Sequence, residues 1–181
     1  MDADFDTAVL GLAMPAGVED ALREAGAHRG DASRVMAALM RAQALAPEHP
    51  AVLIAFYRHH FYGHRLTLAR DVARRALTVG ARALGLPAVW RDVPRTPLVG
   101  ARHDASVRFY LFVLKGYAYL SLRLGDEAEA RDALALLRAI DPQDNVGAAV
   151  LEAVRLRAAA PPDDDDAYLQ ATGAAAWAAT T

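Results

Sequence analysis

Two segments that lie 95 residues apart carry the same pattern, and this repetition constrains the fold more than any other feature. Residues 30–47 read GDASRVMAALMRAQALAP and residues 125–142 read GDEAEARDALALLRAIDP, with six identities in eighteen aligned positions. In each segment a glycine closes the preceding helix, an aspartate caps the free amides of the next helix, and a proline stops it. Each segment is therefore predicted to be the second helix of a helix-turn-helix unit.

The remaining chain also shows helical periodicity. Residues 51–63 and 66–84 are predicted to form another helix pair, and residues 106–122 are the most apolar helix candidate. The composition is rich in alanine, with 54% hydrophobic residues and few β-branched runs, which favours helices over strands. We therefore expect one all-α domain over residues 1–160, with about seven helices and a capping helix at 145–160 that covers the last apolar face.

Two segments do not fit a regular helix. Residues 85–104 contain three prolines and no long apolar stripe, so we expect an irregular loop with one helical turn that packs Trp90 against the core. Residues 161–181 begin after two prolines and include four consecutive aspartates, and they are predicted to form a mobile acidic tail. Alternatively, the tail folds back, with Asp163–Asp166 facing the arginine-rich middle of the chain and Trp177 in a groove.

Charge is spread unevenly along the chain, although the net charge is only −2. Residues 56–108 contain 10 arginines and 3 aspartates, a net charge of +7, whereas the segments before and after carry −4 and −5. Arginines on amphipathic helices commonly face water. A local excess of this size also predicts a positive surface that attracts an acidic partner.

A cluster of histidines lies in FYRHHFYGHR, residues 56–65. His60 and His64 are four residues apart, so on a continuous helix they share one face and form part of a metal site. With His59 they are the alternative metal ligands that the sequence offers. Gly63 is expected to lie at the turn between two helices, and a helix that ends there separates His64 from the other two. The metal alternative therefore requires a helix that continues through Gly63.

Other catalytic and cofactor chemistry has little support. The chain has no cysteine, which excludes disulfides, thiolate ligands and cysteine nucleophiles. No serine is flanked by glycines at a strand-to-helix turn, and the chain contains neither a phosphate loop nor a dinucleotide-binding glycine pattern. We therefore expect a protein that is not an enzyme and that uses no cofactor.

The sequence also predicts location. Its first residues, MDADFDTAVLGLAM, carry acids where a secretory signal carries lysine or arginine. The apolar segment 106–122 contains Arg108 and Lys115, which are costly inside a bilayer, so this segment is predicted to be a buried helix. We expect a cytoplasmic protein with no membrane partner, and its oligomeric state stays open.

The repeated pattern resembles the second half of a tetratricopeptide repeat (TPR). The spacing of glycine, alanine, large apolar residue and proline in that family is matched by Gly125, Ala130, Leu134 and Pro142. The sequence KGYAY at 115–119 is similar to its first-helix pattern. This resemblance implies a TPR-like α-solenoid in which the first helix of each repeat lines a concave groove. The phrases VRFYLFVLKGYAYLSLRLG and ALGLPAVWRDV further resemble small repeat proteins encoded among bacterial nitrogen-fixation genes, which implies an accessory factor in nitrogenase assembly.

The TPR resemblance implies an adaptor or chaperone-like module that recognises proteins, and the charge pattern indicates that its partner is an acidic peptide or protein segment. Nine residues are predicted to bind this partner: Tyr57, Arg58, Phe61, Arg65, Arg74, Arg75, Arg108, Tyr110 and Lys115. An alternative is that the arginines and nearby aromatic residues bind nucleic acid. The slight excess of acids in the whole chain and the lack of a nucleic-acid motif make this less favoured.

Overall fold

The computed structural model describes residues 14–101 and 103–159, and these residues contain helices and loops but no strand. An all-α fold is therefore confirmed for this part of the chain. Its seven α-helices and one 3-10 helix are α2 (Val18–Ala27), α3 (Ala32–Leu45), α4 (Pro50–Tyr62), α5 (Leu66–Ala83), η1 (Trp90–Asp92), α6 (Ala105–Arg123), α7 (Glu127–Ile140) and α8 (Ala149–Ala159).

The helix boundaries follow the capping residues of the repeated pattern. The Asp31 carboxylate accepts hydrogen bonds from the amides of Ser33 and Arg34, both at 3.1 Å, and so caps α3. Asp126 caps α7 in the same way, with a longer bond of 3.4 Å from the Glu129 amide. Each carboxylate satisfies donors that the first turn of a helix leaves free. The predicted starts of both helices are confirmed.

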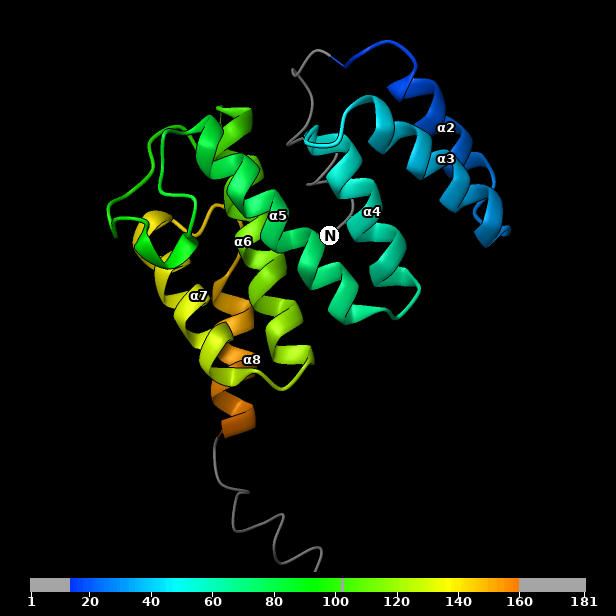
Figure 1. Cartoon of the computed structure of the whole chain (residues 1–181). Helices are drawn as coiled ribbons and strands as arrows, with labels where there is room; N and C mark the ends of the chain where they lie inside the picture. The colour runs from blue at the N-terminus through cyan, green and yellow to red at the C-terminus, as the bar shows by residue number, and fades with distance from the viewer. Residues whose placement is uncertain (1–13, 102, 160–181) are drawn as a thin grey trace, which may run out of the picture.

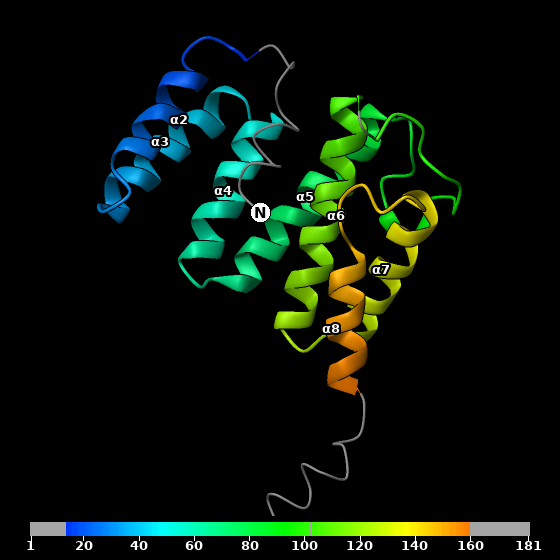
Figure 2. The ribbon, with the colours of Figure 1, turned by 180° about the vertical axis from the view of Figure 1, so that it is seen from behind.

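Helices that follow one another in sequence lie side by side and run in opposite directions, in the pairs α2–α3, α4–α5 and α6–α7 (Figures 1 and 2). The pairs α4–α5 and α6–α7 are joined through close packing of α5 on α6. Gly80 of α5 makes this approach possible, since a Cβ there would lie 3.2 Å from ring carbons of Phe109 and Tyr110. Buried apolar residues form one cluster that extends from Val18 to Ala148.

The segment between α5 and α6 is irregular, as the sequence predicts. Its one turn of helix, η1, places Trp90 in the core with 7% of its surface exposed. The Trp90 ring lies 5.8 Å from the ring of Tyr117, and the Leu98 amide donates to the Ile140 carbonyl at 2.8 Å. These contacts fix the loop against α6 and the end of α7.

The last described helix packs against α7, on the side of the α6–α7 pair that Figure 2 turns toward the viewer. It begins at Ala149 rather than at residue 145, because Asp144 and Gly147 adopt left-handed conformations with φ of 52° and 67°. The prediction for the acidic segment 161–181 and for Asp163–Asp166 concerns residues outside the described part. None of the described helices combines the length and the hydropathy needed to cross a membrane.

Candidate interaction surface

The histidine-rich stretch is a helix end followed by a turn. Helix α4 ends at Tyr62, and the next residues include Gly63 and His64, whose φ is 56°. His59 and His60 therefore lie on α4 while His64 lies beyond it, so the shared helical face that the metal alternative requires does not form. Within the described residues, no group of three or more histidine, aspartate or glutamate side chains could hold a metal ion.

The surroundings of His59 and His60 on α4 lower the pKa of both imidazoles. Burial lowers the pKa of His59 and of His60, and the positive charge of Arg65 lowers both further. Both rings are therefore neutral near pH 7. Their rings lie 5.5 Å apart in an edge-on arrangement.

Four aromatic residues connect the end of α4 to α6. Phe61 is at the centre: its ring stacks on Tyr57 at 5.8 Å and contacts the rings of Tyr62 at 5.4 Å and Tyr119 at 5.9 Å. Tyr62 is 58% exposed, while Tyr119 and Phe61 are half-buried. Tyr57 packs against α6 at Gly116, where an added Cβ would lie 3.1 Å from its hydroxyl. The cluster thus joins the two helices and reaches solvent at Tyr62.

These contacts show which side of α6 faces α4. Gly116 and Tyr119 meet α4 directly, and positions 108, 112 and 123 fall on the same side of α6 at helical spacing. We define the α4–α6 surface by three residues from each helix: Arg58, Phe61 and Tyr62 of α4 with Arg108, Tyr119 and Arg123 of α6. Arg58 and Arg108 are half-buried on it.

Three of the predicted partner-binding residues are engaged within the fold and are left out of the α4–α6 surface. Tyr110 has no exposed surface, because it faces α5 at Gly80 rather than α4. Tyr57 is buried against Gly116 as the base of the aromatic cluster. Lys115 donates to the backbone carbonyl of Val146 and so supports the turn before α8.

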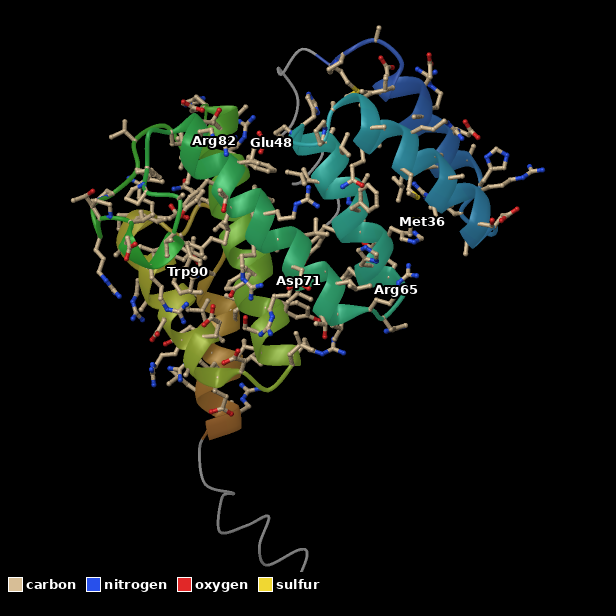
Figure 3. The ribbon with its side chains drawn as sticks, viewed as in Figure 1. Met36, Glu48, Arg65, Asp71, Arg82 and Trp90 are labelled. Carbon is tan, nitrogen blue, oxygen red and sulfur yellow. The ribbon has the colours of Figure 1, made fainter. Side chains whose placement is uncertain are left out.

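Four arginines of α5 and of the following loop pair with carboxylates, three of which come from the flanking segments and one, Asp71, from α5 itself. Arg82 pairs with Glu48 at 2.6 Å, where the end of α5 meets the turn before α4 (Figure 3). The other pairs are Arg70 with Asp126 at 3.1 Å, Arg74 with Asp71 at 3.0 Å, and Arg91 with Glu129. Much of the positive excess of residues 56–108 is thus balanced within the fold. Arg75 is exposed on the side of α5 opposite its buried stripe.

Two arginines next to the aromatic cluster are arranged differently. Arg65, at the turn between α4 and α5, donates to the His59 carbonyl at 3.3 Å (Figure 3). Arg123 donates to the Tyr119 hydroxyl at 2.8 Å and lies 5.8 Å from the centre of that ring. Within the described part of the chain, neither guanidinium forms an ion pair with a carboxylate. Their charge is available to a partner.

A partly buried polar network, which the sequence analysis did not find, lies on the opposite side of α6. The Tyr117 hydroxyl and two amino groups of Arg91 all donate to the Glu129 carboxylate, and Arg91 lies 4.5 Å over the Trp90 ring. Burial alone would raise the pKa of Glu129, but the bonds from Arg91 and Tyr117 outweigh it and lower this pKa. Arg74 approaches the same hydroxyl at 3.5 Å. The network holds the loop against α6 and α7.

A shallow hollow of about 380 Å³ adjoins the α4–α6 surface at Arg65. It lies between the first turn of α5 and the end of α6. Its lining consists of His64, Arg65, Leu66, Thr67, Leu68 and Leu124. Leu68 and Leu124 are 47% and 37% exposed, so apolar side chains meet solvent there. No signal in the sequence alone brings Leu124 next to Leu68.

These features define an all-α protein of paired helices with an arginine- and aromatic-rich surface along α4 and α6. A protein of Azotobacter chroococcum mcd 1, the "Uncharacterized 19.8 kDa protein in nifW 5'region", is 35% identical to the chain over 150 residues, which cover 82% of this chain and 84% of that protein. The chain belongs to the same family as this protein. No family model matches the chain, and no solved structure matches it.

Proposed function

We propose that the protein is a non-catalytic interaction module with a TPR-like α-solenoid arrangement, in which α4 and α6 are the first helices of successive repeats and α8 is the cap. Its partner is an acidic peptide or protein segment. This segment lies along the α4–α6 surface, with its carboxylates near Arg58, Arg65 and Arg108 and its apolar groups against Phe61 and Tyr62.

One observation carries this proposal: the arginines are divided into two groups. Arg82 and Arg70 of α5 and Arg91 of its loop are engaged by Glu48, Asp126 and Glu129, whereas Arg65 and Arg123 bond only to a carbonyl and a phenol within the described residues. Exposed guanidinium groups beside aromatic rings are typical of protein-binding surfaces, where arginine and tyrosine supply much of the binding energy. The division therefore selects α4 and α6 over α5.

The biological setting comes from the relative. Its printed description places it in a nifW 5' region, and the 35% identity extends over most of both chains. We infer that this protein is an accessory factor connected with nitrogen fixation, acting in the cytoplasm on a protein of that system. Two proteins that share a family and this extent of sequence are expected to share the class of partner, although a fold alone does not define one.

The proposal is tested by affinity purification of the tagged full chain from nitrogen-fixing cells of its native organism. The test variant is Arg58→Gln/Arg65→Gln/Arg108→Gln, and the control is Arg29→Gln/Arg75→Gln/Arg95→Gln, which removes the same charge from exposed positions elsewhere. The expected result is a protein with an acidic segment that binds the wild type and the control, is lost from the test variant, and elutes with salt. Equal recovery on both variants would contradict the proposal.

A further inference from the structure

The hollow beside Arg65 adjoins the α4–α6 surface but has a more apolar lining. Its walls are three leucines, Leu66 and Leu68 from α5 and Leu124 from the end of α6. Leu68 lies in the first turn of α5 and Leu124 at the C-cap of α6, 56 residues later in the sequence, so the hollow exists only in the folded chain. Two leucines that remain 47% and 37% exposed leave apolar surface in water, which an apolar group of a partner would remove.

The charges around the hollow have one sign. Arg65 is among its lining residues, and no aspartate or glutamate lines it. The guanidinium of Arg65 lies over the turn, where a Cβ on Gly63 would be 3.0 Å from it, so this cation is held at the rim next to Phe61 and Tyr62. An apolar site with a fixed positive rim matches an apolar side chain that has acidic neighbours.

We propose that this hollow receives one large apolar side chain of the acidic partner segment, such as phenylalanine or leucine, and that the acidic residues next to it in the partner lie over Arg65. This inference rests on the proposed function and adds the anchor that determines which acidic segments bind. The volume of about 380 Å³ accommodates one such side chain. Affinity then depends on the leucines, and attraction to acidic residues depends on Arg65.

The test uses purified full-length protein and three short labelled peptides in fluorescence anisotropy titrations. The first peptide has aspartates on both sides of one phenylalanine, the second has serine in place of the phenylalanine, and the third replaces the aspartates by asparagine. The variants are Leu68→Ser/Leu124→Ser and Arg65→Gln, with Val99→Ser as a control because Val99 is 92% exposed outside the hollow. Thermal melting of each variant confirms that it is folded.

The expected result is that the wild type and Val99→Ser bind the phenylalanine peptide about tenfold more tightly than the serine peptide, since burial of one aromatic side chain is worth at least that factor. The Leu68→Ser/Leu124→Ser variant loses this preference. The Arg65→Gln variant binds both acidic peptides more weakly but keeps the preference for phenylalanine over serine. If the double leucine variant keeps the preference, or the wild type binds both acidic peptides equally, the anchor is wrong while the proposed function stands. If the asparagine peptide binds as well as the aspartate peptide, or no peptide binds, the proposed function fails and the anchor with it.

Discussion

The hydroxyl of Tyr117 on α6 donates a hydrogen bond to the carboxylate of Glu129 on α7. Arg91, from the loop between α5 and α6, binds the same carboxylate through two amino groups. One partly buried acid thus receives donors from a helix and from the loop, and it ties η1 to the helix pair. The long loop is held by this bond network and by Trp90, so it acts as a structural part of the fold rather than as a binding element.

Loss of the Tyr117 hydroxyl should destabilise the protein. We expect Tyr117→Phe to lower the free energy of unfolding by about 1–3 kcal/mol, because a hydrogen bond to a charged, mostly buried carboxylate is lost. The matched control is Tyr110→Phe: this tyrosine is equally buried, but no hydrogen bond from the described residues reaches its hydroxyl. Urea denaturation measures the free energy of unfolding of both variants. Equal losses for the two substitutions would contradict the role given to the network.

The hydrogen bonds to Glu129 also predict that the stability of the protein falls at low pH. The pKa of Glu129 in the folded protein lies below its ordinary value of 4.5, so its contribution to stability is present above that value and is lost as the pH falls through the folded pKa. Glu129→Gln should therefore flatten the loss of stability in acid, measured by denaturation across this range. Glu127→Gln, at an exposed position of the same helix, is the control and should leave the profile unchanged.

Alkaline conditions should affect the protein through Tyr110. Burial raises the pKa of Tyr110 to about 12. A phenol that is harder to ionise in the folded state contributes stability below its unfolded pKa of about 10 and loses it as the pH rises toward 12. The melting temperature should fall between about pH 10 and about pH 12 more steeply in the wild type than in Tyr110→Phe. Identical slopes would show that ionisation of Tyr110 is not coupled to unfolding.

Packing of α5 on α6 depends on a glycine. We expect Gly80→Ala to destabilise the protein by about 1–3 kcal/mol, because its Cβ would lie 3.2 Å from the fixed rings of Phe109 and Tyr110. Gly26→Ala in α2 is the matched control, since nothing lies within 4 Å of a Cβ there. That substitution should stabilise the protein by up to about 1 kcal/mol through helix propensity. If chemical denaturation shows the same change in the free energy of unfolding for Gly80→Ala as for Gly26→Ala, the close approach of α5 to α6 at Gly80 is refuted.

Local signals in the sequence predicted the helices well. Asp31 and Asp126 cap the helices that follow them, and Gly63 marks the end of α4, since each of these effects depends on only a few neighbouring residues. Trp90 was also predicted to pack on the core, because a large aromatic residue in a polar loop has few other favourable positions.

Tertiary relationships could not be predicted in the same way. Tyr110 and Lys115 were assigned to the partner-binding face, but α6 is buried on most sides, and the sequence does not indicate which side meets α4 and which meets α5. That choice depends on Gly80 and Gly116, where helices approach closely. The pairing of Arg91 with Glu129, 38 residues away, likewise depends on the completed fold. This is why the charge excess along the sequence overstated the positive surface.

The central claim is that the α4–α6 surface, rather than the arginines of α5, binds acidic segments. Its most direct test is the affinity of a labelled aspartate-rich peptide with one phenylalanine for three full-length proteins: the wild type, Arg58→Gln/Arg65→Gln/Arg108→Gln and Arg29→Gln/Arg75→Gln/Arg95→Gln. We expect a loss of affinity of about tenfold or more for the first variant and little change for the second, although both remove the same charge. Equal affinities for the two variants, or tighter binding of a single-stranded oligonucleotide than of the peptide by the wild type, would contradict it.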